Sequence, residues 1–365
     1  MTPFPAASDI ADARIVDLFA GPGGLDVAAH WLGIPVVGIE WDRDACMTRR
    51  RAGLDTREGD VRTFSPADFP DATMLAGGPP CQTFTVAGTG AGRVALDTVL
   101  TLVDAMAQGD DVRSRIAEFD DERTGLVLEP LRWALQAHKA GASYEAIVLE
   151  QVPAVLPVWE AMASVLRSIG YSVSTGVLRT EEYGVPQTRR RAILIARQRS
   201  NVVMPIATHR PYRKGANREF GDSDRKPWNT MADALKETRG YEFSVVSNYG
   251  TGGDPKARGR RTCNEPAFTV TGKVSRNRVF DANGIEVERF TSAEAGRLQT
   301  FPLNFPWRGS DIAQQIGNAI PPRLGTHILA AVMGISDLLD EQFFAQAIDG
   351  DWSRPPEISD LVQVS

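Results

Sequence analysis

The residue with the strongest chemical potential is a cysteine that follows two prolines in the run 77–84, Gly-Gly-Pro-Pro-Cys-Gln-Thr-Phe. A buried cysteine usually fills a small apolar space, and that interpretation suits Cys46 and Cys263. It suits Cys81 poorly, because a loop of glycine and proline offers no core to fill and the prolines fix its backbone. A rigid loop that presents a thiol predicts a nucleophile at Cys81.

A second candidate site is the run 17–25, Asp-Leu-Phe-Ala-Gly-Pro-Gly-Gly-Leu, where a predicted strand gives way to a predicted helix. Its glycines allow the backbone to turn tightly and to approach a ligand. Glu40 ends the next predicted strand, where a carboxylate can accept hydrogen bonds from ribose hydroxyls, and Trp41 offers a flat face to an adenine. Asp60 ends a third segment and could bind the adenine amine. An ordinary tight turn is the alternative, but these carboxylates favour a nucleoside cofactor.

A third candidate is Glu150, which ends the apolar strand predicted at 146–149. In a parallel sheet this position lies at the same edge as Glu40 and Cys81. A helix cap or a solvated glutamate is an alternative of equal weight for this residue taken alone.

The fourth candidate is the run 187–191, Gln-Thr-Arg-Arg-Arg, which enters the strand predicted at 191–196. Runs of arginine usually face solvent. In a strand, however, Gln187, Arg189 and Arg191 share one side, and two guanidinium groups on one face can bind a phosphate or a base carbonyl.

The elements that would position these residues alternate between strands and helices. Short apolar runs predict further strands at 14–19, 35–39, 72–76 and 171–178, and helical periodicity is present at 25–33, 127–139 and 158–169. This alternation predicts an α/β domain with a largely parallel sheet. From 200 to 290 the chain is rich in Gly, Pro, Asn and Arg, with only short strand-like runs such as 242–249 and 267–274, which predicts a second, irregular domain. Helical signal returns at 291–301 and 321–339.

The composition indicates a globular protein with unevenly distributed charge. The chain has 365 residues, three cysteines and a net charge of −6, without the cysteine spacing of a disulfide framework or a zinc site. We find neither a signal peptide nor an apolar span, and expect a soluble cytoplasmic protein that uses no membrane and no metal. The segment 186–280 contains 20 Lys and Arg against 8 Asp and Glu. This balance favours a phosphate-facing surface over an ordinary solvated one.

Taken together, the four sites resemble those of the DNA cytosine-5 methyltransferases. Two late motifs, EAGRLQTFP at 294–302 and QIGNAIPPRLG at 315–325, complete that family's order over nearly the whole chain. The resemblance implies an α/β, Rossmann-like S-adenosylmethionine-dependent methyltransferase fold formed by 1–199 and 291–350, whose C-terminal segment packs beside the first strand. It implies a smaller, irregular target-recognition domain at 200–290. The polar composition from Asp351 onward predicts a tail at 351–365. Gln151 stands where the family usually has Asn, and Thr85 where it usually has Ser.

The resemblance also implies roles for individual residues. S-adenosylmethionine would be bound by Phe19, Gly21, Gly23, Gly24, Leu25, Glu40, Trp41, Asp60, Val61, Pro79 and Asn318. The catalytic residues would be Cys81, Glu150, Arg189 and Arg191, and the DNA contacts Gln82, Thr85, Gln187, Arg258, Arg260, Arg261, Lys273 and Arg276. The region 88–123 would be a mobile catalytic loop followed by a helix-containing insertion.

In the implied mechanism, the Cys81 thiolate adds to C6 of a cytosine that has been flipped out of double-stranded DNA. Protonated Glu150, its pKa raised by burial, donates toward N3 while Arg191, with Arg189, holds O2. C5 then takes the methyl group of S-adenosylmethionine, and loss of the C5 proton with elimination of the cysteine frees the product. We expect a monomer in a restriction–modification or orphan methylation role, with a cognate restriction endonuclease as a candidate partner.

Three alternatives stay open from the sequence. A tRNA cytosine-5 methyltransferase shares the motifs, but the basic region at 200–290 favours DNA. A non-catalytic DNA-binding relative would not need to retain Cys81, Glu150 and Arg191 together. A Rossmann dehydrogenase lacks support because the chain has no Gly-x-Gly-x-x-Gly turn.

Overall fold

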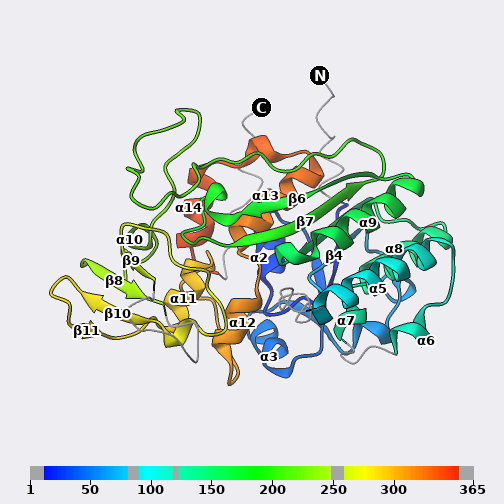
Figure 1. Cartoon of the computed structure of the whole chain (residues 1–365), viewed down its shortest axis with the longest axis horizontal. Helices are drawn as coiled ribbons and strands as arrows, with labels where there is room; N and C mark the ends of the chain where they lie inside the picture. Colours follow the sequence, from blue (N-terminus) through cyan, green and yellow to red (C-terminus); the bar gives the residue numbers. More distant parts are fainter. Residues whose placement is uncertain (1–11, 81–89, 118–122, 248–258, 353–365) are drawn as a thin grey trace.

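A seven-stranded sheet forms the centre of the computed structural model, which describes residues 12–80, 90–117, 123–247 and 259–352 (Figure 1). Its strands are β1 (Ile15–Leu18), β2 (Val36–Glu40), β3 (Asp55–Glu58), β4 (Met74–Gly77), β5 (Ala146–Gln151), β6 (Ser172–Arg179) and β7 (Arg190–Arg197). They lie in the order β3-β2-β1-β4-β5-β7-β6. The pairs from β3 to β5 are parallel, and β7 is antiparallel to both of its neighbours. The predicted α/β class with a largely parallel sheet is confirmed.

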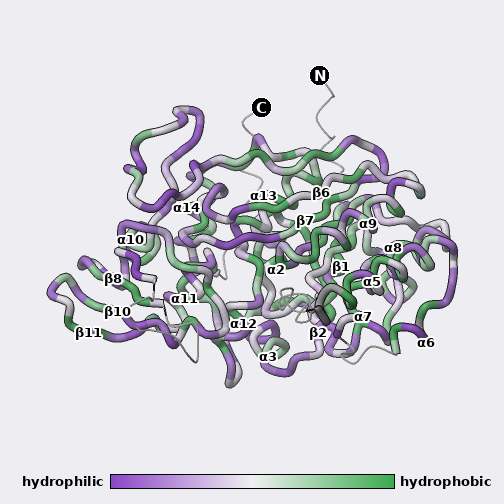
Figure 2. The backbone as a smooth tube through the Cα atoms, in the orientation of Figure 1, coloured by the Kyte–Doolittle hydropathy of each residue, from purple (hydrophilic) through white to green (hydrophobic). Residues whose placement is uncertain are grey.

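Helices cover both faces of this sheet because its central strands β1, β4 and β5 are buried on both sides. On one face α2 (Gly24–Trp31) packs beside α13 (Pro322–Met333), and on the other lie α5 (Gly90–Ala107), α8 (Glu129–Lys139) and α9 (Leu156–Ser168). Figure 2 shows that hydrophobic segments gather in this sheet and its covering helices, whereas the peripheral loops are largely hydrophilic.

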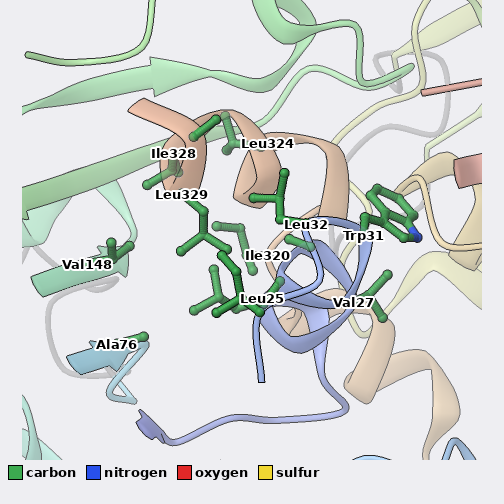
Figure 3. Packing of buried hydrophobic residues seen from close by; sticks show 14 of the residues in the cluster. Leu25, Val27, Trp31, Leu32, Ala76, Val148, Ile320, Leu324, Ile328 and Leu329 are labelled. Carbon is green, nitrogen blue, oxygen red and sulfur yellow. The ribbon is translucent and has the colours of Figure 1, made fainter. Parts of the chain in front are cut away.

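The late helix α13 packs against α2, the helix that follows the first strand β1. Figure 3 shows Leu25 of α2 close to Ile320 and Leu329, with Ala76 of β4 and Val148 of β5 on the left of the view in the same cluster. All five side chains are buried. Burying a Leu, Ile or Val side chain contributes roughly 1.5–3 kcal/mol, so this contact joins early and late segments of the chain into one core.

A second, smaller sheet is entirely antiparallel and has the strand order β11-β10-β8-β9. Its strands are β8 (Phe243–Val246), β9 (Arg260–Thr262), β10 (Arg278–Asp281) and β11 (Glu286–Val287). Its buried face packs on α10 (Met231–Ala234), α11 (Ser292–Leu298) and α12 (Ile312–Asn318). This core therefore joins the irregular region to the helices that follow it in the chain.

The prediction of a strand at 267–274 is wrong. Ala267 makes only an isolated bridge to Gln187, and the segment ends in the 3-10 helix η6 (Val274–Arg276). The Thr188 N–H donates to the Ala267 carbonyl at 2.9 Å, and the Val270 N–H donates to the Gln187 side chain at 2.9 Å. These bonds direct the backbone of the segment toward the start of β7 instead of into a sheet.

The remaining elements are short or lie at the edges of the fold. They are α3 (Arg43–Arg51), α6 (Arg113–Ile116), α7 (Arg123–Leu126), α14 (Glu341–Asp349) and the 3-10 helices η1 (Val61–Thr63), η2 (Pro66–Asp68), η3 (Pro153–Val155), η4 (Thr180–Tyr183) and η7 (Ser336–Leu338). The region 88–123 contains α5 and α6, as predicted for a helical insertion. In the described part of the chain, none of the helices has the length and hydropathy needed to cross a membrane.

The tail expected from 351 onward is packed at its start. The Trp352 indole donates to the Ala52 carbonyl at 3.0 Å and its ring lies 4.8 Å from that of His30, measured between centroids. The Trp352 N–H also donates to the Asn304 side chain at 3.1 Å. The described chain therefore ends on an anchored aromatic residue.

Candidate active site

A cavity of about 650 Å³ opens at the carboxyl ends of β1, β2, β4 and β5. The expected cofactor residues Phe19, Gly21, Gly24, Leu25, Glu40, Trp41, Asp60, Val61 and Asn318 line it, and so do Glu150 and Arg191. Gly23 and Pro79 do not line it. Their positions are next to lining residues, at the start of α2 and before Pro80 respectively.

The turn after β1 has an unusual backbone. Phe19 adopts a left-handed conformation with φ of 60°, which is rare for a bulky residue and is concentrated at functional sites. A Cβ atom on Gly24 would lie 2.3 Å from the Ile320 carbonyl oxygen, so only glycine permits α2 to start so close to the C-terminal segment. The backbone of this turn thus forms part of the cavity wall and also contacts the late segment that contains Ile320.

The Glu40 carboxylate holds this turn from the neighbouring strand. The Gly21 N–H donates to Oε2 at 2.7 Å, and the N–H groups of Trp41 and Asp42 donate to Oε1 at 2.8 and 2.7 Å. Burial raises the pKa of Glu40, and the three backbone donors oppose that rise. The Glu40 carboxylate oxygens have further lone pairs that these donors do not use, and these can accept a hydrogen bond from a ribose hydroxyl in the cavity.

Asp60 and Trp41 also line the cavity. Arg62 donates to the Asp60 carboxylate through Nη2 at 2.6 Å, and this hydrogen bond lowers the pKa of Asp60. Trp41 is 58% exposed, which leaves its indole available for stacking. The pair offers an acceptor and a flat apolar face, the two features that an adenine would use.

The Glu150 carboxylate and the Arg191 guanidinium form an ion pair inside the cavity. Glu150 comes from the end of β5 and Arg191 from the start of the adjacent antiparallel strand β7. Their side chains are only 14% and 12% exposed, so the pair is largely desolvated. The structure therefore brings together an acidic group and a planar cation, two groups that can act on one bound base.

The loop that leads to the predicted nucleophile starts beside Glu150. A Cβ atom built on Gly78 would lie 3.6 Å from Glu150 Oε2, and Pro80 lines the cavity. The next residues, including the predicted Cys81, Gln82 and Thr85, lie outside the described ranges, as does Arg258. The described part of the loop thus ends at the cavity wall.

Arg189 does not share the cavity with Arg191, which corrects the expectation of a catalytic contact. It is 1% exposed, and its guanidinium donates at 2.8 Å to the carbonyls of Val270 and Gly317. The reason is that Arg189 precedes β7, where the segment 267–272 and the end of α12 cover it. Its position can support the wall that carries Asn318.

Gln187 is also buried, which corrects its expected DNA contact. It is fully shielded from solvent, and its amide donates to the Leu298 carbonyl at 2.9 Å and to the Gln299 side chain at 2.7 Å. Arg261 has a comparable structural role, because its guanidinium lies 4.8 Å from the Tyr212 ring centroid and 4.4 Å from that of Phe268. Both side chains join the small sheet region to the start of β7.

The other described candidates for DNA contact are exposed. Arg260 lies 5.2 Å from the centroid of the Phe280 ring on the outer face of the small sheet. Lys273 precedes η6 and Arg276 is its last residue, and both are exposed as well. These three cations are accessible to a phosphate backbone.

Sequence reasoning missed several residues of the cavity. Asp17 lines it from β1 and is 4% exposed; burial, reinforced by nearby Asp26, raises its pKa well above the usual value. A carboxylate inside the apolar strand Ile-Val-Asp-Leu was a signal that could have identified it. Arg123 and Leu126 of α7 also line the cavity, and no motif in the sequence marks them. Within the described ranges, no group of three or more His, Cys, Asp and Glu side chains could hold a metal ion.

Comparison with known proteins identifies the family. The model of the C-5 cytosine-specific DNA methylases matches residues 13–102 and 116–334. The chain belongs to this family. It is accordingly a DNA cytosine-5 methyltransferase by class, as the motif order predicted. The gap in the match, 103–115, falls within the helical insertion.

Sequence relatives agree with this membership, and solved structures share the fold. The chain is 25% identical over 360 residues to the type II methyltransferase M.NgoFVII of Neisseria gonorrhoeae, covering 88% of this chain and 87% of the relative. It is 29% identical over 332 residues to M.NlaX of Neisseria lactamica, covering 84% and 92%. The fold matches a putative DNA modification methyltransferase encoded within an Escherichia coli prophage, with a TM-score of 0.59, 16% identity and coverage of 89% and 99%. The Dnmt2 methyltransferase of S. pombe matches with a TM-score of 0.57, 16% identity and coverage of 88% and 98%.

Proposed function

We propose that this chain methylates carbon 5 of a specific cytosine in double-stranded DNA, with S-adenosylmethionine as the methyl donor and Cys81 as the nucleophile. The observation that carries the proposal is the desolvated pair of Glu150 and Arg191, which lies in one cavity with the glycine turn and next to the start of the cysteine loop. This arrangement supports a site for a base next to a site for a nucleoside cofactor.

The cavity residues fit the cofactor that the family implies. The glycine turn and the Glu40 carboxylate would hold its ribose, Trp41 and Asp60 its adenine, and Asn318 would close the pocket from α12. A volume of about 650 Å³ is within the usual range for a ligand of this size. S-adenosylmethionine supplies an electrophilic methyl group when bound there.

The protein residues would make the cytosine reactive. Addition of the Cys81 thiolate to C6 converts the ring into an enamine whose C5 is nucleophilic. Glu150 would direct a proton toward N3, and Arg191 would hold the O2 atom through its guanidinium fork. Loss of the C5 proton and elimination of the cysteine would restore the aromatic ring and release the enzyme.

Access to C6 requires the base to leave the helical stack, at a cost of a few kcal/mol. Phosphate contacts would offset this cost, and the basic segment 186–280 offers exposed cations at Arg260, Lys273 and Arg276. We assign the region 200–290 to target recognition, and 1–199 with 291–350 to catalysis. One protomer suffices for a reaction on a single base.

A restriction–modification role is the biological setting we favour, because M.NgoFVII and M.NlaX are called type II methyltransferases. A cognate endonuclease is then the candidate partner. Sequencing of methylated positions in DNA from cells that express the chain would give the target sequence, and treatment of that DNA with a restriction endonuclease that cleaves this sequence would test protection.

The decisive experiment uses a DNA duplex that carries 5-fluorocytosine, which blocks loss of the C5 substituent and traps the covalent adduct. The wild-type chain should form a stable adduct when S-adenosylmethionine is present, whereas Cys81→Ser should form none. Cys263→Ser is the matched control, because that thiol is buried in the core of the small sheet. Formation of an adduct by Cys81→Ser would refute the assignment of Cys81 as the nucleophile. Methyl transfer to tRNA but not to duplex DNA would refute the assignment of DNA as the substrate.

A further inference from the structure

A buried ion pair lies beneath the glycine turn, outside the residues that line the cavity. Arg49 of α3 has no solvent exposure, and its guanidinium donates to both Asp26 carboxylate oxygens at 2.8 and 2.6 Å. It also donates to the Thr56 hydroxyl and the Asp55 carbonyl at 3.0 Å each. The N–H groups of the Arg49 guanidinium thus point into the protein, toward the first turn of α2 and toward β3.

The backbone around Arg49 leaves room for it. A Cβ atom on Gly38 would lie 2.0 Å from Arg49 Nη2, and one on Gly23 would lie 3.6 Å from Nη1. Strand β2 and the glycine turn therefore contact the guanidinium directly. Through Asp26, which follows the turn by two residues, Arg49 fixes where α2 begins.

Arg49 is also the buried cation that acts on two carboxylates of the cavity. Asp17 of β1 and Glu40 of β2 both line the cavity, and they are 4% and 8% exposed. Burial raises the pKa of each, and the charge of Arg49 opposes the rise in both. The other ionisable groups around this pair include Asp26 from α2, Cys46 and Arg50 from α3, Glu58 from β3 and Glu150 from β5.

We propose that Arg49 is a positioning residue for the methyl donor: it holds the glycine turn through Asp26, and its charge sets how strongly Asp17 and Glu40 attract a cationic ligand. The inference rests on the proposed function, because S-adenosylmethionine is a sulfonium cation. Asp17 and Glu40 attract such a ligand only when they are ionised.

The sign of the effect can be predicted. The affinity for S-adenosylmethionine is highest at pH values above the pKa values of Asp17 and Glu40, where both carboxylates are ionised. It decreases as the pH falls through these pKa values. Replacing Arg49 by a neutral residue removes a cation and moves this decrease to higher pH. Replacing Asp26 by Asn removes an anion next to Asp17 while Arg49 remains, and moves the decrease to lower pH.

The test is calorimetric titration of S-adenosylmethionine into the full chain between about pH 5 and pH 9. Arg49→Met should shift the midpoint upward and Asp26→Asn downward, each by about one pH unit, which is the usual effect of a nearby charge. Arg50→Met is the matched control, because Arg50 lies on the same helix, is exposed and pairs with Glu58 at the surface. S-adenosylhomocysteine, which has a neutral sulfur atom, should show a weaker pH dependence.

Arg49→Met leaves the Asp26 carboxylate buried without its partner, so two further variants are measured with it. Arg49→Lys keeps the charge and should keep the midpoint of the wild type, and Arg49→Met/Asp26→Asn removes both charges. Shifts of equal direction in Arg49→Met and Asp26→Asn, or no shift in either, would overturn the proposal. Failure of the wild type to bind S-adenosylmethionine would instead overturn the proposed function, and this inference with it.

Discussion

The Gln151 side chain donates a hydrogen bond of 2.7 Å to the Pro79 carbonyl, and its own amide oxygen accepts from the Val152 N–H. Gln151 follows Glu150 at the end of β5, and Pro79 follows β4, the parallel neighbour of β5. The residue that departs from the family's usual Asn thus connects the strand of the glutamate to the loop that leads to Cys81.

Shortening this side chain should slow methyl transfer. Gln151→Asn retains the amide but lacks one methylene, so it cannot make both hydrogen bonds from the same position. A lost hydrogen bond of this kind costs about 1 kcal/mol, which corresponds to a roughly fivefold lower rate if the loop is positioned less well. Single-turnover methyl transfer would measure this, with the exposed residue Gln342→Asn as control. An unchanged rate would show that the bond to Pro79 does not matter for the reaction.

Replacing the acid of the cavity should abolish most activity without unfolding the protein. Glu150→Gln keeps the size of the side chain but cannot supply a proton, and general acid–base catalysis typically contributes about 10²–10⁴-fold. We expect a loss of that size in kcat, measured as methyl transfer to duplex DNA, while the affinity for S-adenosylmethionine changes little. Glu160→Gln, an exposed site on α9, is the control. A decrease of less than tenfold would argue against the role of Glu150.

Arg189 should matter more for stability than for chemistry. Arg189→Met leaves the buried carbonyls of Val270 and Gly317 without their donor, and each such group costs about 1–3 kcal/mol. We expect the free energy of unfolding in urea to fall by about 3 kcal/mol, with little change for the exposed neighbour Arg190→Met. Wild-type stability combined with loss of methyl transfer would restore Arg189 to the catalytic residues.

His327 should make the protein less stable in acid. Burial, with a smaller contribution from Arg323, lowers the pKa of His327 to about 3, and its ring lies between those of Tyr183 and Phe344. The unfolded chain therefore binds an extra proton between about pH 6.5 and pH 3, and the free energy of unfolding decreases as the pH falls through this window.

Removing that titration should flatten the pH profile. In His327→Phe an aromatic ring is retained without an ionisable group, so the slope should decrease by up to about 1.4 kcal/mol per pH unit. Urea unfolding at several pH values measures the slope. His138→Gln, an exposed site on α8, should leave the slope unchanged, and the same result for His327→Phe would contradict the prediction.

Local patterns were sufficient to predict much of the chemistry. Apolar runs, glycine turns and carboxylates at strand ends depend on neighbours in the chain, and they placed Phe19, Glu40 and Glu150 at one edge of a parallel sheet, where the cavity lies. The order of the motifs predicted the family, because each motif requires particular residue types at a short spacing.

Contacts between distant segments could not be predicted in this way. Alternation along a strand gave Gln187, Arg189 and Arg191 one common side, but it could not show that 267–272 and α12 cover the first two and leave Arg191 in the cavity. The same holds for Arg49, which one would expect on a solvated helix face until Gly38, eleven residues earlier, is seen to make space for it. Burial and partner choice depend on how the whole chain packs, and that information is distributed over residues far apart in the sequence.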